Sequence, residues 1–221
     1  MTVHDIEPVS RESTAGIIAR QLRAAIMNGA LAPGTQLTEA DLAAQFEVSR
    51  GPLREAMQRL VQEGLLRSEL HRGLFVIDLD AADVDDIYLA RTAVERAAVT
   101  RIVRADSLRQ TAVEQLSEVQ ELMVAAARAG DQNAMSDADL RFHEVLVESS
   151  GSKRLVRMAQ TLLAETRMCL SALQLTYRTA EERVDEHRQI VEAIREADEE
   201  QVLHLLEAHM IDAVNRLAPR P

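Results

Sequence analysis

Three of the six histidines in the chain share an unusual position. His143, His187 and His209 each lie on or beside the apolar face of a different predicted helix. Asp139 precedes His143 by four residues, so both side chains point at one spot on the same helix face. Burying an imidazole without a partner costs roughly 1–3 kcal/mol. Three of them with one carboxylate indicate a divalent transition metal ion, Zn²⁺ above all, with Ni²⁺ or Mn²⁺ left open.

Two other interpretations compete with a binding site. For each histidine taken alone, a hydrogen-bonded core residue is the alternative; His204, which is off the apolar face, is expected to face solvent. An Asp/His₃ centre with open positions would also suit a metal-dependent hydrolase. Glu144 points about 100° away from its helical neighbour His143. The sequence therefore offers no evident general base, and we expect no enzyme.

A second kind of chemistry is indicated by Arg50 and Arg54. They are four residues apart in the first turns of a predicted helix and are therefore neighbours on its surface. Arginine can clamp a phosphate or bind guanine O6 and N7 with two hydrogen bonds. Ser49 and the first backbone N–H groups of that helix suit another phosphate.

Two predicted helices present these arginines. Thr38 can cap the first helix, with Asp41 three residues on. The stretch Glu47-Val48-Ser49 interrupts it, Ser49 can cap the second helix, and Gly64 ends that helix. Apolar residues at helical spacing give the second helix a core face, namely Leu53, Ala56, Met57, Leu60 and Val61. This layout predicts a helix-turn-helix.

The flanking segments extend the motif. A helix around Ile17–Ile26 precedes it, and Pro33-Gly34 turns the chain into it. Two short apolar runs, 65–67 and 74–77, follow as a hairpin, with His71-Arg72-Gly73 at the turn. The order predicts a winged helix-turn-helix that binds double-stranded DNA. The alternative is a small helical domain whose arginines are merely solvated.

The rest of the chain is predicted to be an antiparallel six-helix bundle, so the fold class is mainly α. The expected spans are 81–104, 107–129, 132–150, 153–174, 179–197 and 199–217. We expect a flexible tail over 1–12, a DNA-binding domain over 13–78, and a domain for metal, effector and dimerisation over 79–221.

Composition agrees with two domains. The 221 residues carry a net charge of −11, of which residues 1–78 hold −2 and residues 79–221 hold −9, so a DNA face can still be locally basic. Aromatic residues make up only 2%, which disfavours a base-stacking platform. A single cysteine, Cys169, excludes an intramolecular disulfide. No long apolar run and no signal peptide are evident, so we expect a cytoplasmic protein without a membrane segment.

Residues 13–77 resemble the DNA-binding domain of the GntR family of bacterial transcription regulators. The matching phrases are IARQLRAAIMNGALAPGTQLTE, DLAAQFEVSRGPLREAMQRLVQEGLL and HRGLFV. The resemblance implies DNA contacts from Ser49, Arg50, Gly51, Arg54, Arg72 and Gly73. Many relatives have a basic residue after the equivalent of Glu39, where this chain has Ala40. Either one phosphate contact is missing, or a neighbour such as Arg23 replaces it.

Residues 80–217 resemble the FCD effector-binding domain of the FadR subfamily. The matching phrases are YLARTAVERAAV, DADLRFHEVLVESSGSKRL, EHRQIVEAIREAD and LLEAHMIDA. The resemblance implies that Asp139, His143, His187 and His209 are the metal ligands, and six helices point to the VanR-like branch. It also implies that Arg91 and the metal hold a small carboxylic acid. The alternative for Arg91 is an ion pair with Glu95, one helical turn on.

Together these patterns predict a homodimeric transcription regulator that acts as a repressor and that a carboxylate effector releases from a palindromic operator. A regulator that senses the metal ion itself is the remaining alternative.

Overall fold

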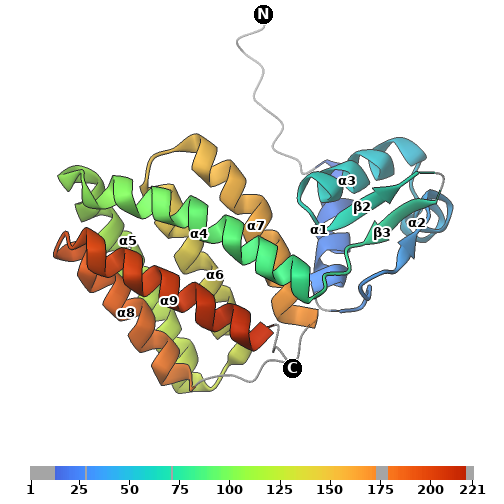
Figure 1. The fold of residues 1–221 in the computed structure, drawn as a ribbon. Helices are drawn as coiled ribbons and strands as arrows, with labels where there is room; N and C mark the ends of the chain where they lie inside the picture. Colours follow the sequence, from blue (N-terminus) through green and yellow to red (C-terminus); the bar gives the residue numbers. More distant parts are fainter. Residues whose placement is uncertain (1–12, 28, 71, 173–178, 218–221) are drawn as a thin grey trace, which may run out of the picture. The chain divides into compact units, whose positions relative to one another are not determined.

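The computed structural model describes residues 13–27, 29–70, 72–172 and 179–217 (Figure 1). The chain divides into two compact units between Ile77 and Asp78, which we call the N-terminal and the C-terminal unit. The predictions for the tail over 1–12, for His71 and for the end of the helix expected over 153–174 fall wholly or partly outside the described residues.

The N-terminal unit is a winged helix-turn-helix. Its helices are α1 (Thr14–Met27), α2 (Glu39–Phe46) and α3 (Arg50–Gln62). Its strands are β1 (Gln36–Leu37), β2 (Leu66–Glu69) and β3 (Gly73–Val76), arranged antiparallel in the order β1-β3-β2. In the hairpin, Leu66 pairs with Val76 and Glu69 pairs with Gly73.

Local signals set the ends of α2 and α3. The hydroxyl of Thr38 accepts a hydrogen bond from the backbone N–H of Asp41, as the sequence predicts. Ser49 stands at the N-cap of α3, but its side chain makes no capping hydrogen bond, which leaves the hydroxyl available for another acceptor or donor. Gly64 has a φ of 75°, a left-handed conformation that glycine adopts without strain just past a helix end.

The core of this unit lies between α1, α3 and the sheet. Leu53, Ala56 and Leu60 of α3 are fully buried, and Ile18 and Leu22 of α1 are almost so. Apolar burial of this kind contributes about 1.5–3 kcal/mol for each large side chain. It fixes α3 so that its opposite face, with Arg50 and Arg54, is exposed.

The C-terminal unit is a bundle of six helices in the described residues. They are α4 (Ala81–Val103), α5 (Asp106–Ala129), α6 (Gln132–Ser149), α7 (Lys153–Ala172), α8 (Ala180–Arg195) and α9 (Glu199–Leu217). Helix α4 packs against α7 and α9, and α5 packs against α6 and α8. Two ion pairs, Arg96–Glu207 and Arg104–Glu199, show that α4 and α9 run antiparallel. The predicted fold class is confirmed.

Caps and a continuous apolar core hold the bundle in place. Asp80 forms a capping box with Asp83 at the start of α4, and Thr179 forms one with Glu182 at the start of α8. The main core includes Ile102, Leu116 and Phe142, each fully buried. Because α6, α8 and α9 all contribute to this core, polar side chains on their inward faces meet in the interior.

Candidate metal centre and nucleic-acid interface

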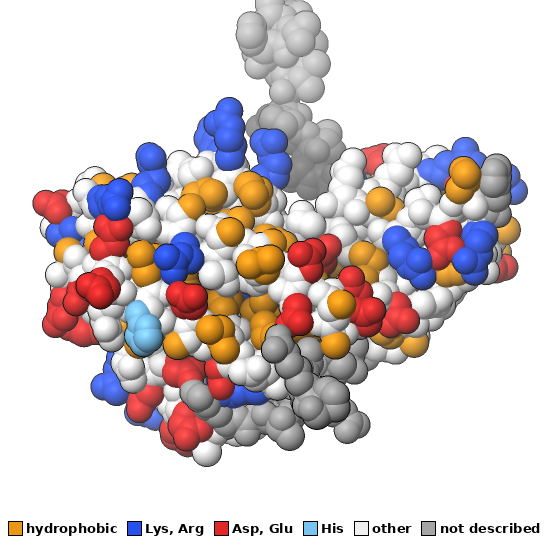
Figure 2. Space-filling model, in the orientation of Figure 1, with side chains coloured by type: hydrophobic (Ala, Val, Ile, Leu, Met, Phe, Trp, Pro, Cys, Tyr) orange, Lys and Arg blue, Asp and Glu red, His pale blue; other side chains and the backbone are white. Residues whose placement is uncertain are grey.

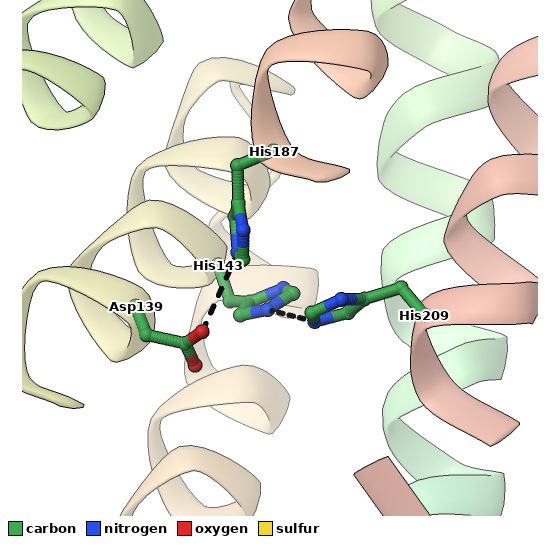
Figure 3. Close-up of side chains that lie close together, drawn as sticks. All are labelled: Asp139, His143, His187 and His209. Carbon is green, nitrogen blue, oxygen red and sulfur yellow. Dashed lines mark hydrogen bonds and ion pairs between the residues drawn. The ribbon is translucent and has the colours of Figure 1, made fainter. Parts of the chain in front are cut away.

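Three inward-facing helices bring the predicted metal ligands together. Asp139 and His143 come from α6, His187 from α8 and His209 from α9 (Figure 3). Each offers one ligand atom, and these atoms all lie within 4.8 Å of one another. His143 Nε2 is 3.1 Å from His209 Nε2, and His187 Nε2 is 3.6 Å from Asp139 Oδ1. Two nitrogens bound to one zinc ion at about 2.0–2.1 Å lie roughly 3–4 Å apart, so the cluster is close to the size that a single cation needs.

The other ring nitrogen of each histidine has an oxygen partner. His143 Nδ1 is 2.7 Å from Glu95 Oε2, His187 Nδ1 is 2.9 Å from the carbonyl oxygen of Arg183, and His209 Nδ1 is 3.3 Å from Glu186 Oε2. These oxygens accept hydrogen bonds, so each Nδ1 carries the proton of a neutral ring. The Nε2 lone pairs are left to face the shared centre, as in metal-binding histidines.

Burial keeps these rings neutral. It lowers the pKa of His187 to about 3. It also lowers the pKa values of His143 and His209. Burial alone would raise the pKa of Asp139, but the surrounding histidines hold it below its ordinary value, so the carboxylate is ionised. An ionised oxygen and three neutral nitrogens are the protonation states that a metal ion needs.

A polar atom of His187 tests whether these residues fit a cation. His187 Nε2 is buried and has no hydrogen-bond partner among the described residues. The ring is held edge-to-face against Phe142, with centroids 4.5 Å apart. A buried acceptor without a donor is unfavourable, and a cation at the shared centre would satisfy it. The donor set and its geometry therefore fit a divalent metal ion.

A pocket opens beside the cluster. Its cavity volume is about 50 Å³, and Asp139 and His209 form part of its wall. Its other charged lining residues are Arg91, Arg183, Glu186, Asp212 and Arg216. The pocket is therefore suited to a small polar molecule that reaches the cluster.

Arg91 forms the ion pair with Glu95 that was one of the two interpretations made from the sequence, and its role in holding an effector stays a prediction. It is buried on α4 and lines the pocket, yet its Nε donates to Glu95 Oε1 at 3.1 Å. Its Nη2 lies 3.0 Å from the same oxygen but is not aligned to donate a hydrogen bond, and it has no other such partner among the described residues. Burial alone would lower the pKa of Arg91, but the negative charges of Glu95, Tyr88 and Asp139, together with the hydrogen bond to Glu95, raise it, so the guanidinium stays charged.

The predicted DNA-contacting residues of α3 lie together at its start. Ser49, Arg50, Gly51 and Arg54 are all exposed, and a side chain added at Gly51 would meet nothing within 4 Å. Arg54 Nε donates to both carboxylate oxygens of Glu39 on α2 at 2.8 Å. Arg23, the possible substitute for a missing cation at Ala40, is hydrogen-bonded to Glu63.

The wing carries the other two predicted DNA-contacting residues, Arg72 and Gly73. Gly73 has a φ of 100°, which favours glycine at the start of β3. Arg72 is 67% exposed, pairs with Glu69 and lies over the Phe75 ring at 5.1 Å from its centroid. On the visible face of the N-terminal unit, basic side chains lie beside acidic ones (Figure 2). Arg54 and Arg72 are thus each held in an exposed ion pair.

Some residues around the metal cluster were not singled out from the sequence. The sequence pattern indicates Glu95 only as a partner of Arg91 and gives no signal for Glu186, although each accepts a hydrogen bond from a cluster histidine. A signal for Glu95 does exist, because a glutamate on the apolar face of a helix needs a buried partner. Its second partner, His143, is 48 residues away and could not be predicted from local spacing.

Comparisons with known proteins agree with both halves of this description. Residues 14–76 match the family model for bacterial regulatory proteins of the gntR family, and residues 86–212 match that of the FCD domain. The gluconate operon transcriptional repressor of Bacillus licheniformis is 31% identical over 214 residues, covering 95% of this chain and 87% of that protein. The HTH-type transcriptional regulator YdhC of Bacillus subtilis is 31% identical over 190 residues, covering 86% and 84%.

A solved structure extends the likeness to three dimensions. A GntR transcriptional regulator from Rhodococcus sp. RHA1 superimposes with a TM-score of 0.76 at 27% identity, covering 92% of this chain and 96% of that one. The chain belongs to the GntR family of bacterial transcriptional regulators and carries an FCD domain. Proteins of this family are DNA-binding regulators rather than enzymes, and the hydrolase alternative is set aside. No helix in the described parts of the chain is long and apolar enough to cross a membrane.

Proposed function

We propose that this DNA-binding regulator is a homodimeric repressor whose FCD domain binds one divalent metal ion and, beside it, a small carboxylic acid. The observation that carries the proposal is the convergence of three Nε2 atoms and one carboxylate, with every Nδ1 held by an oxygen. Asp139, His143, His187 and His209 would hold the ion. A mixed nitrogen and oxygen set favours Zn²⁺, with Ni²⁺ and Mn²⁺ as alternatives, over the all-oxygen sites of Ca²⁺ and Mg²⁺.

The pocket supports the second ligand. A bound metal ion would supply positive charge and open coordination positions for carboxylate oxygens. Arg91 lines the same pocket and has a buried N–H group that Glu95 does not take up, so it can donate a charge-assisted hydrogen bond to that acid. The pocket therefore favours an organic acid as the signal over the metal ion alone.

The N-terminal unit supplies the DNA contacts in this proposal. Arg50 and Arg54 would face base edges or phosphates in the major groove, with Ser49 and Gly51 close to the backbone. Arg72 and Gly73 would bring the wing to a neighbouring phosphate. With Arg23 occupied by Glu63 and alanine at position 40, we expect one phosphate contact fewer than in relatives with a basic residue there.

A repressor on a two-fold operator is the simplest arrangement. A homodimer matches two half-sites of a palindrome, and the relative from Bacillus licheniformis is named as a transcriptional repressor. The effector can release DNA only by as much as its affinity differs between the DNA-bound and the free form. We place this regulator in the cytoplasm, where its operator would be.

One experiment distinguishes an organic acid from the metal ion as the signal. Metal-free protein is prepared with a chelator, loaded with Zn²⁺, and screened for thermal stabilisation by a panel of small carboxylic acids. Operator binding is then measured for the metal-free, Zn²⁺-loaded and acid-treated forms on promoter fragments from the gene's own locus. Release that requires both metal and acid supports the proposal. Release by Zn²⁺ alone would replace it with a metal sensor, and absence of Zn²⁺ binding would remove the metal site.

A further inference from the structure

One buried carboxylate touches both halves of the ligand site. Glu95 lies on α4 with only 2% of its surface exposed. Its Oε1 is 3.1 Å from Arg91 Nε and 3.0 Å from Arg91 Nη2, and its Oε2 is 2.7 Å from His143 Nδ1. The two oxygens of one side chain therefore join the pocket arginine to a histidine of the metal cluster.

We infer that Glu95 is a positioning residue that couples metal binding to anion binding. The inference rests on the proposed function, because it assigns the metal to His143 and the anion to Arg91. By accepting the Nδ1 proton, Glu95 fixes the tautomer in which His143 Nε2 carries a lone pair toward the cluster. By pairing with Arg91, it holds the guanidinium at the wall of the pocket.

Because Glu95 is shared, the structure indicates whether anion binding should strengthen or weaken metal binding. Glu95 divides one negative charge between a guanidinium and an imidazole N–H. When an anion binds Arg91, it competes with Glu95 for the guanidinium. The Glu95 carboxylate then interacts more strongly with the Nδ1–H group of His143. A carboxylate that bonds more strongly to Nδ1–H makes the opposite nitrogen a better metal donor. The anion and the metal ion therefore bind with positive cooperativity, and each raises the affinity of the other by the same factor.

Thr166 provides a matched control on the same arginine. It is 1% exposed, and its hydroxyl oxygen lies 3.5 Å from Arg91 Nη1, a much weaker contact than the one to Glu95. Thr166→Val keeps the volume and alters the surroundings of Arg91 without altering the carboxylate on His143. Glu95→Gln keeps the shape of the side chain and removes its charge.

The first measurement needs no metal. In metal-free protein with ¹⁵N-labelled histidine, NMR reports which ring nitrogen of His143 carries the proton. We expect Nδ1–H in the wild type and in Thr166→Val, and a mixture of tautomers in Glu95→Gln. A His143 tautomer unchanged by Glu95→Gln would overturn the positioning role, and this result holds whether or not the protein binds metal.

The second measurement is a Zn²⁺ titration by calorimetry, with Zn²⁺ alone as the probe. Glu95→Gln should weaken Zn²⁺ binding by about 10- to 100-fold, as the loss of such a partner does elsewhere, and Thr166→Val by less than about twofold. Arg91→Met releases Glu95 as a bound anion would, so it should strengthen Zn²⁺ binding, by about fivefold for typical coupling. In the Glu95→Gln background the same Arg91→Met change should have a smaller effect, because only the direct repulsion between Arg91 and the cluster is then removed.

The wild type, the two single variants and the double variant form a double-mutant cycle that tests the coupling. Equal effects of Arg91→Met with and without Glu95 would overturn it. If Glu95→Gln leaves Arg91 uncompensated and does not fold, the double variant removes both buried charges and is compared with Arg91→Met alone; equal Zn²⁺ affinity in those two proteins overturns the role of Glu95. A wild type that binds no Zn²⁺ contradicts the proposed function instead, and the NMR measurement still tests Glu95.

Discussion

Arg54 of the second helix of the helix-turn-helix and Glu39 of the first are joined by a charge-assisted hydrogen bond. Arg54 Nε lies 2.8 Å from both oxygens of the Glu39 carboxylate, and the arginine side chain remains 60% exposed. The hydrogen bond to Arg54 lowers the pKa of Glu39, so the carboxylate stays ionised. Glu39 thereby limits where this guanidinium can point before DNA arrives.

Arg54→Ala should weaken binding to the operator by about tenfold to a hundredfold if Arg54 contacts a base. Fluorescence anisotropy with labelled promoter fragments measures the change. Arg59→Ala is the control, because Arg59 is on the same helix and is also exposed and paired with a glutamate, Glu55, one turn away. Equal losses in the two variants, or none in Arg54→Ala, would contradict a specific role for Arg54.

Glu39→Gln tests the restraint itself. Without the negative charge, Arg54 is free to meet any phosphate, and one repulsive group near the DNA is gone. We expect affinity for unrelated duplexes to rise by about twofold to fivefold at low salt while the preference for the operator falls. A variant with unchanged discrimination would show that the pair does not guide Arg54.

His187→Ala should strip the protein of most of its metal. The change removes one of four donors and leaves the metal-free protein able to bind operator, because the N-terminal unit is untouched. Elemental analysis of the purified protein measures occupancy. His204→Ala is the control, since this exposed histidine lies on α9 outside the cluster. Full occupancy in His187→Ala would exclude His187 as a ligand.

The metal-free protein should lose stability on mild acidification. The pKa of His187 is held at about 3 by burial, against 6.5 for an ordinary histidine. Below pH 6.5 the unfolded chain therefore binds a proton that the folded chain does not, so stability falls with pH and the loss ends near pH 3. The slope is about 1.4 kcal/mol per pH unit for each such histidine. Urea unfolding of chelator-treated protein between pH 7 and 5 measures it, and a flat profile would contradict neutral burial.

Phe142→Ala should destabilise the bundle by about 3–5 kcal/mol, the usual effect of removing a fully buried aromatic ring. It should also weaken Zn²⁺ binding, because Phe142 packs edge-to-face against His187. Urea unfolding and Zn²⁺ titration measure the two effects. Leu122→Ala, at a position 59% exposed, should change stability by less than about 0.5 kcal/mol. Similar losses in both variants would contradict this description of the core.

The fold can be predicted from local signals because most of its elements carry their own periodicity and caps. The core face of α3 and the caps at Thr38 and Gly64 come directly from residue types. Strand β1 is missed because it has two residues, and its only support is pairing with β3. Ile17, at the start of the predicted first helix, is 37% exposed, although its neighbour Ile18 is buried.

Part of the candidate site can be predicted from the sequence and part cannot. The convergence of Asp139, His143, His187 and His209 can be predicted, because polar residues on apolar faces of several helices must meet in the interior. That they bind metal stays a prediction. The hydrogen-bond partners of the rings cannot be found by spacing, since they depend on how α4 and α8 pack against α6 and α9.

The four donors are gathered from distant points of the chain, and His209 is 66 residues beyond His143. During synthesis the winged unit leaves the ribosome long before the last donor does. If this cluster binds a cation, its capture is a late step in biogenesis, and a nascent chain can hold a complete DNA-binding unit while the C-terminal unit is still incomplete.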